Sequence, residues 1–284
     1  MTEIEHGNSN VALIVHSCDR YEFLYRGFQF FFEKFWNFNT NCNYYFATEE
    51  KAFSFNHFKN IQSGKGEWAD RLAFLLREKI REKYILYFQE DMWLNKKTNS
   101  GFFNQLFSLT EENNWKQVKL HSSHEYKTIA TKYFVEGFNI SLLDNAHSDF
   151  LMSHQVTLWD KEFLLTQLHK KEHPWRNERR GTKRLRKLNP EIFQADYFAE
   201  NGQMENNKND NPVLRSGYHT ISMNGVLRDN VIPYIQELEK SDNANKEYGE
   251  KLEYHYKNKL THDGLPKPMK VDIFKRTKNW LQGK

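Results

Sequence analysis

In the first part of the chain, short hydrophobic runs alternate with segments in which hydrophobic and polar residues recur at helical spacing, which is the pattern of an α/β protein. Short apolar runs open residues 11–21 and fill residues 43–48 and 84–88, and each predicts a buried strand. Between them, apolar residues recur at helical spacing in two segments. These residues are Leu24, Phe28, Phe31, Phe32 and Phe35 in the first segment, and Trp68, Leu72, Leu75, Leu76 and Ile80 in the second. This order predicts an α/β fold with a sheet that is at least partly parallel.

The second half of the sequence is less regular. Residues 160–171 have the pattern of an amphipathic helix with Asp160 at its start. Residues 200–217 are rich in Asn, Gly and Asp and predict a long surface loop. No internal repeat or linker divides the chain. We therefore predict a polar tail at 1–10, one main domain at 11–235 and a basic, helical appendage at 236–284.

Composition limits the class of protein. Aromatic residues make up 15% of the 284 residues, enough large side chains to build a core although only 38% of the chain is hydrophobic. The formal net charge of +4 suits an anionic ligand or a membrane surface without requiring nucleic acid. Two cysteines, Cys18 and Cys42, are too few for a disulfide framework, so we interpret both as reduced core residues of a cytoplasmic protein. The polar N-terminus does not resemble a secretory signal, and no apolar run reaches the roughly 20 residues that span a bilayer.

Two adjacent carboxylates, Glu90 and Asp91, directly follow the third predicted strand. Like charges so close repel unless a cation lies near them. One interpretation is a solvated turn in which Asp91 caps or bends the chain. The other is a divalent cation bound to these carboxylates and to a diphosphate. Because ligands gather at the carboxyl ends of strands in α/β sheets, Ser17, Asp19 and Arg20 are expected near the same edge.

Four segments, in this order, resemble the bacterial GT-A-fold glycosyltransferases that build capsule, O-antigen and lipopolysaccharide sugars. The segments are VHSCDRY, GEWADRLAFLLREKIREKYILYFQEDMWL, SHQVTLWDKEFLLTQL followed by EHPWRNE, and GYHTISMNGVLRDN, and they extend over residues 11–230. The resemblance implies a Rossmann-like nucleotide-sugar-binding domain with a mixed central sheet. It also implies transfer of a sugar from a UDP-linked donor to a surface glycan or a lipid-linked glycan. The acidic motif reads Gln-Glu-Asp in place of Asp-x-Asp, which leaves open whether Mn²⁺ or Mg²⁺ is bound and whether a metal is needed.

The resemblance implies that donor contacts come from the loop after the first strand, the start of the second helix and the acidic turn. The residues are Ser17, Asp19, Arg20, Trp68, Asp70, Arg71 and Glu90. Hydroxyl and carboxylate groups suit the base and ribose, and guanidinium groups suit phosphate. Two alternatives stay open: Asp19 and Arg20 pair with each other at the surface, and Trp68 is a core residue. The implied metal ligands are Asp91, Glu90 and His219, although a lone histidine is more often structural.

For the reaction, the resemblance implies an inverting transfer with a carboxylate base. Glu178, in the segment HPWRNE, is the predicted base, and Asp91 is the second predicted catalytic residue. The acceptor side is predicted to be lined by His154, Gln155 and Trp175, the last by stacking on the sugar. The alternative for Glu178 is an ordinary ion pair with the arginines around it, whose charges would lower its pKa and make it a poorer base.

A different class of function is suggested by residues 169–187, which hold nine Lys or Arg against two Glu. Such a run contacts phosphates in a nucleic-acid- or polyanion-binding protein, or it is a solvated helix face. Together with the basic C-terminal tail, it also suits an anionic membrane surface. The sequence contains no zinc-ligand spacing, P-loop or GxSxG motif. We therefore expect a cytoplasmic glycosyltransferase, peripheral at the inner face of the plasma membrane, with polyanion binding as the alternative.

Overall fold

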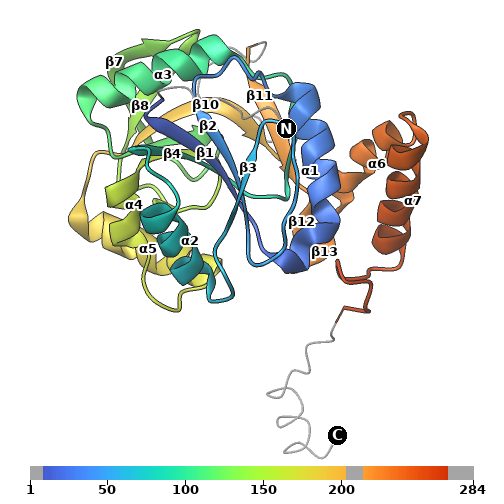
Figure 1. Cartoon of the computed structure of the whole chain (residues 1–284). Coiled ribbons are helices and arrows are strands. Elements are labelled where there is room, and N and C mark those ends of the chain that lie inside the picture. Colours follow the sequence, from blue (N-terminus) through green and yellow to red (C-terminus); the bar gives the residue numbers. More distant parts are fainter. Residues whose placement is uncertain (1–8, 203–213, 268–284) are drawn as a thin grey trace, which may run out of the picture. The chain divides into compact units, whose positions relative to one another are not determined.

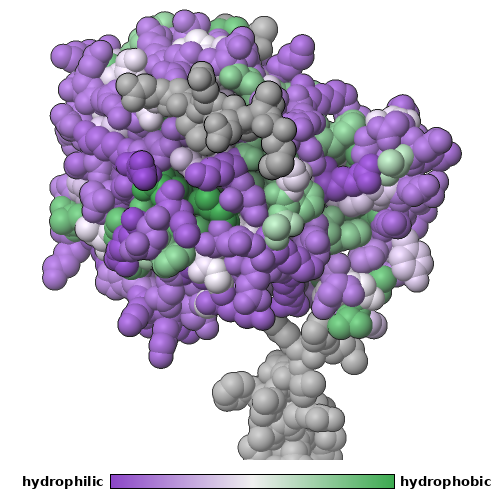
Figure 2. Space-filling model, in the orientation of Figure 1, coloured by the Kyte–Doolittle hydropathy of each residue, from purple (hydrophilic) through white to green (hydrophobic). Residues whose placement is uncertain are grey.

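The computed structural model describes residues 9–202 and 214–267 and divides the chain into two compact units, Met1–Ile221 and Ser222–Lys284 (Figure 1). The sequence places the end of the main domain later, at residue 235, and that domain assignment stays a prediction. Among the described residues, no helix is both long and apolar enough to cross a membrane. The face seen in Figure 2 is mostly hydrophilic, with hydrophobic side chains gathered in small patches.

The first unit contains eleven strands and five α-helices among its described residues. The strands are β1 (Val11–His16), β2 (Asn43–Thr48), β3 (Lys59–Gln62), β4 (Tyr84–Phe88), β5 (Met92–Lys96), β6 (Gln117–His121), β7 (Thr128–Val135), β8 (Phe138–Leu143), β9 (Thr157–Asp160), β10 (Phe193–Glu200) and β11 (Ser216–Thr220). The helices are α1 (Glu22–Phe35), α2 (Trp68–Glu78), α3 (Ser100–Asn113), α4 (Lys161–Gln167) and α5 (Pro174–Leu188), with a 3-10 turn η1 (Asp19–Tyr21) before α1.

The strands form one mixed sheet in the order β3-β2-β1-β4-β9-β6-β10-β11-β5, with β8 also pairing with β10 and β7 with β8. Strands β1, β2, β3 and β4 are mutually parallel, in agreement with the predicted partly parallel sheet, and β3 is a further strand that the sequence pattern did not predict. Strand β9 then pairs antiparallel with both β4 and β6. The predicted α/β class with a mixed central sheet is therefore confirmed.

Helices cover both faces of the sheet because the central strands are buried on both sides. On one face, α2 packs through Leu72 and Leu76 against Ile14 of β1 and Ile85 of β4, and α4 and α5 complete this layer. On the other face, α1 packs aromatic side chains on the alternate strand positions, as where Phe32 lies edge-on to Phe88 at 5.9 Å. Figure 1 shows α1 and α2 on opposite sides of the sheet.

The less regular half of the sequence folds partly as expected. Asp160 caps α4 by accepting a hydrogen bond from the Phe163 backbone N–H at 2.8 Å, but the helix ends at Gln167, before the predicted residue 171. The predicted loop at 200–217 lies largely outside the described residues, with β10 ending before it and β11 beginning at Ser216. Both cysteines carry free thiols: Cys42 is buried and Cys18 half-buried.

The second unit begins with a short hairpin, β12 (Ser222–Met223) and β13 (Val226–Leu227). A 3-10 turn, η2 (Asp229–Val231), leads into α6 (Ile232–Leu238), and α7 (Asn243–Lys257) packs on it. Gly249 of α7 permits this packing, since a Cβ there would lie 3.3 Å from the Leu238 Cβ. The helical part of the predicted appendage is thus present, and most of its basic tail lies outside the described residues.

Candidate functional site

The sheet changes direction between β1 and β4, and the candidate site lies at the carboxyl ends of these strands. From β1 the chain moves outward to β2 and β3, then returns to place β4 on the other side of β1. Val15 of β1 is in register with Phe88 of β4, so the two strands end side by side. The loops after them diverge, and such a switch point is where α/β sheets bind ligands. Its position confirms that the predicted loop and acidic turn share one edge.

The loop after β1 is tied to the loop after β2 through Asp19. Its carboxylate accepts hydrogen bonds from the backbone N–H groups of Glu49, Glu50 and Lys51 at 2.9–3.0 Å. The Ser17 hydroxyl donates to the Ala47 carbonyl at 2.6 Å. Both predicted donor residues therefore shape the loop itself. The alternative Asp19–Arg20 pair does not form among the described residues, and Arg20 is exposed.

Arg71, on the first turn of α2, places a buried guanidinium group beneath this edge. It donates to the Ser17 carbonyl at 3.0 Å and lies 3.5 Å from a Glu49 carboxylate oxygen. Its charge also reaches Glu90 and His16, shifting the pKa of each downward. Asp70 beside it accepts a hydrogen bond from the Lys171 backbone N–H at 3.1 Å, so it links α2 to the segment before α5.

The two acidic residues occupy a tight turn between β4 and β5. The Glu90 carbonyl accepts a hydrogen bond from the Trp93 indole at 3.1 Å, and the Asp91 carbonyl accepts one from the Ile221 N–H at 3.0 Å. Glu90 is buried, and burial together with the neighbouring charge of Asp91 raises its pKa well above the usual range. Arg71 opposes this shift. A second positive charge near the turn would favour the ionised form of Glu90.

A divalent cation at this turn would have two carboxylates of this chain as ligands. His219 lies on β11 opposite Trp93, with its Nδ1 3.4 Å from the Asn95 side-chain nitrogen, and burial alone lowers its pKa. In the described part of the chain, no group of three or more His, Cys, Asp or Glu is arranged to hold a metal. His219 is thus not gathered into a ligand cluster with Asp91 and Glu90. One or two carboxylates still suit a cation that is held mainly by substrate phosphates.

A buried layer of aromatic and imidazole rings connects this edge with the predicted acceptor residues. His154 lies against Trp68, with ring centroids 4.2 Å apart, and His16 Nδ1 lies 3.4 Å from the Tyr87 hydroxyl. Burial lowers the pKa of His154 to about 3, so this ring is neutral at pH 7. Trp68 is a core residue, as the alternative interpretation held, and it also contacts His154, one of the predicted acceptor residues.

Glu178 projects from the second turn of α5, a helix that begins at Pro174 and is capped by the His173 side chain. Its carboxylate accepts a hydrogen bond from the His154 backbone N–H at 3.0 Å. Burial raises the pKa of Glu178, and the hydrogen bond from the His154 N–H and the charge of Lys119 oppose this shift. The alternative, an ion pair with the neighbouring arginines that lowers its pKa, does not form among the described residues. Arg176, Arg179 and Arg180 are exposed on the helix, and water weakens their effect on the half-buried carboxylate.

A buried lysine that sequence reasoning missed lies behind Glu178. Lys119, on β6, donates a hydrogen bond to the Ser153 hydroxyl at 2.7 Å and lies 5.2 Å from the centre of the Tyr126 ring. Burial lowers its pKa to about 7, against the opposing effect of Glu178 and Glu200. The only signal in the sequence is a lysine within a short strand otherwise flanked by apolar residues.

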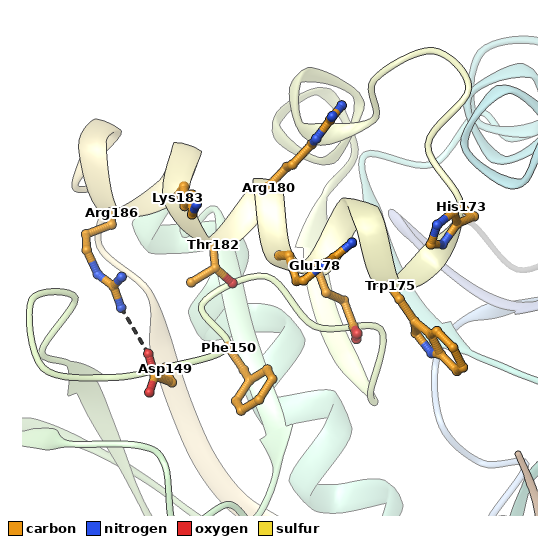
Figure 3. A pocket seen from close by; sticks show the side chains of 10 residues that line it. Asp149, Phe150, His173, Trp175, Glu178, Arg180, Thr182, Lys183 and Arg186 are labelled. Atoms are coloured by element: carbon orange, nitrogen blue, oxygen red, sulfur yellow. Dashed lines mark hydrogen bonds and ion pairs between the residues drawn. The ribbon is translucent and has the colours of Figure 1, made fainter. Parts of the chain in front are cut away.

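The remaining predicted acceptor residues, Gln155 and Trp175, have different environments. Gln155 accepts a hydrogen bond from the Tyr218 hydroxyl at 2.7 Å. Trp175 is 54% exposed and lines a pocket of about 780 Å³ together with Glu178 (Figure 3). The other lining residues are Asp149, Phe150, His173, Arg179, Arg180, Thr182, Lys183 and Arg186. The structure thus brings the predicted base and the predicted stacking residue to one pocket.

No family model matches the sequence, and no curated protein matches it. Solved structures match it in three dimensions. Residues 1–349 of S. aureus TarS match with a TM-score of 0.46 and 9% identity over 96% of this chain and 78% of that chain. The same protein in complex with UDP matches with a TM-score of 0.43 and 10% identity, over 87% of this chain and 70% of that chain. The chain spans about half, 47%, of the longer TarS structure.

A UDP-glucose pyrophosphorylase complexed with UDP-glucose matches with a TM-score of 0.39 and 9% identity, over 66% of this chain and 90% of that chain. Identities near 10% and TM-scores below 0.5 carry no inference about activity.

Proposed function

We propose that the protein is a glycosyltransferase that moves a sugar from a nucleotide-sugar donor to a glycan acceptor. The observation that carries the proposal is the contact between Trp68 and His154, at 4.2 Å, because it joins two parts of one site. Trp68 belongs to the helix that positions Arg71 beside the acidic turn, and the His154 N–H holds Glu178. A donor at the switch point would therefore be next to a half-buried carboxylate.

The donor side is assigned to the carboxyl edge of β1 and β4. The loop shaped by Ser17 and Asp19 would hold the base and ribose, and Arg71 would contribute positive charge toward the diphosphate. A divalent cation bound by Asp91 and Glu90 would offset the charge that develops on the departing diphosphate. The UDP identity of the nucleotide follows from the sequence resemblance.

Glu178 has the properties of a general base for an inverting transfer. Its raised pKa favours proton uptake, and the His154 N–H fixes its orientation. It would remove the proton from the acceptor hydroxyl as the new bond from that oxygen to the sugar carbon forms. The bond from the sugar carbon to the diphosphate breaks on the opposite face, and its electron pair leaves with the nucleotide.

The acceptor and the cellular location are proposals from the same resemblance. We propose a surface glycan of the capsule or lipopolysaccharide kind as acceptor. The protein would act in the cytoplasm at the inner membrane face, where the basic α5 and the C-terminal tail would contact anionic lipids.

The test is release of UDP from a panel of UDP-sugars, with water and with added saccharides as acceptors. We expect release by the wild-type protein and at least a hundredfold slower release by Glu178→Gln. No release from any donor, combined with oligonucleotide binding that falls steeply with salt and is unchanged in Asp91→Asn, would replace the proposal with a polyanion-binding function.

A further inference from the structure

The pocket beside Glu178 carries two cationic side chains without a counter-charge. Of its four basic residues, Arg186 pairs with Asp149 at 3.3 Å, and Arg180 approaches Glu172 at 3.7 Å. Figure 3 shows Arg180 pointing away from the ring of Phe150. Within the described ranges 9–202 and 214–267, Arg179 and Lys183 make no ion pair or side-chain hydrogen bond, and both are exposed.

The two cations are arranged as a row with an aromatic ring. Trp175, Arg179 and Lys183 follow one another at intervals of four residues on α5, so they lie on the same face of the helix. Two like charges at this spacing repel each other and destabilise the helix. An anion bound between them would turn this repulsion into attraction.

The opposite wall of the pocket presents a second aromatic ring. Phe150 is 52% exposed and has a backbone φ of 51°, in the left-handed region that bulky residues rarely adopt. In Figure 3 the side chains of Trp175 and Glu178 point toward the same side of α5 as the Phe150 ring. Exposed aromatic faces suit the apolar C–H face of a sugar ring. The pocket therefore combines sites for a sugar ring, a hydroxyl and an anion.

We propose that the acceptor is an anionic glycan. Its reacting sugar stacks on Trp175 with a hydroxyl at Glu178, and a phosphate or carboxylate substituent lies between Arg179 and Lys183. Arginine binds either anion through two parallel hydrogen bonds, and lysine adds a point charge. This inference rests on the proposed function, since it names the chemistry of that acceptor.

The test compares binding of glucose 6-phosphate, glucuronate and glucose by titration calorimetry at 50 and 300 mM NaCl. We expect the wild-type protein to bind at least one anionic sugar about tenfold or more tightly than glucose at low salt, with a smaller preference at high salt. A preference for the phosphate or for the carboxylate supports the proposal and identifies the substituent. Arg179→Ala/Lys183→Ala should reduce the preference to within about twofold, whereas Trp175→Ala should weaken all three sugars alike.

The matched control is Lys187→Ala, which removes one exposed charge of the same helix outside the pocket. It should keep the wild-type preference. The proposal is overturned if the wild type shows no preference, if the double variant keeps it, or if Lys187→Ala lowers it as much. An oligonucleotide that binds through the same two residues more tightly than the anionic sugars do overturns the proposal in favour of a nucleic-acid site.

The same samples separate this inference from the proposed function. Thermal stabilisation by UDP without any preference for anionic sugars leaves the transferase in place and removes only the anionic acceptor. A preference for anionic sugars without any effect of the nucleotide overturns the transferase, and the pocket remains an anionic-glycan site.

Discussion

Replacing Glu178 with glutamine separates the chemistry of this residue from its structural role. Glutamine has the same shape, and its Oε1 can still accept the hydrogen bond from the His154 N–H, which is 3.0 Å long in the native protein. It cannot take up a proton from the acceptor. General bases contribute about 10²- to 10⁴-fold to rates, equivalent to roughly 3–5 kcal/mol of barrier. We therefore expect Glu178→Gln to slow transfer by this factor.

The effect on folding should be small and should depend on pH. A hydrogen bond to a neutral acceptor is weaker by about 1 kcal/mol than one to a carboxylate, but the variant no longer buries a charge. Burial raises the pKa of Glu178 above its ordinary value of 4.5, so the native state holds this proton more tightly than the unfolded chain. The wild type therefore loses stability as pH rises from about 4.5 through the raised pKa. The variant should lack this loss.

The assay combines UDP release at saturating donor with urea unfolding between pH 4 and 8. Glu162→Gln, an exposed glutamate of α4, is the control and should match the wild type in both measurements. Wild-type turnover in Glu178→Gln would refute the role as base. If Glu178→Gln turns over slowly but its stability depends on pH as that of the wild type does, the argument that burial raises the pKa of Glu178 is refuted.

Three further variants test the structural arguments by urea unfolding. Asp19→Ala removes the acceptor of three backbone hydrogen bonds and should lower the free energy of unfolding by about 2–4 kcal/mol. This is less than the sum of three lost hydrogen bonds, because two of the amides are re-exposed to water. A loss below about 1 kcal/mol would contradict this. Gly27→Ala should destabilise the protein by about 1–3 kcal/mol, because the new Cβ would lie 2.1 Å from the Trp93 ring. Helix propensity alone predicts a gain in stability of about 1 kcal/mol, so a measured gain would contradict the packing argument. Lys119→Met should stabilise the protein by a few kcal/mol at pH 7, because burial lowers the native pKa of Lys119 from 10.5 to about 7. The gain should shrink to about 1–2 kcal/mol at pH 9.5, and a gain that does not shrink with pH would contradict this reasoning.

Strands β1, β2 and β4 and helices α1 and α2 were predictable because continuous apolar runs mark the strands and helical spacing marks the helices. The acidic turn followed from its place after a strand. The link between Trp68 and His154 was not predictable, since it depends on how α2 meets the segment after residue 150. The environment of Glu178 shows the same limit. Its neighbours in sequence are arginines, but its neighbours in space are a backbone N–H and the buried Lys119. Sequence proximity therefore gave the wrong direction for its pKa.

The metal is the part of the site that local sequence constrains least. Two adjacent carboxylates are compatible with a cation or with a solvated turn, and burial of Glu90 is a property of the folded protein. Glu90 is buried in the folded protein, so the turn is not fully solvated, and a cation at this turn stays a prediction.

The most direct test of the central claim is thermal unfolding of the wild type and Asp91→Asn with UDP, GDP, CDP and CMP, each with Mn²⁺ and with a chelator. A nucleotide at about 100 times its dissociation constant stabilises the folded state by roughly 2.7 kcal/mol, which is a clear shift. We expect a shift with UDP and Mn²⁺ that disappears in the chelator and in Asp91→Asn. A shift that survives both would contradict the role of the cation at the acidic turn. No shift with any of the four nucleotides would contradict a nucleotide site at the ends of β1 and β4.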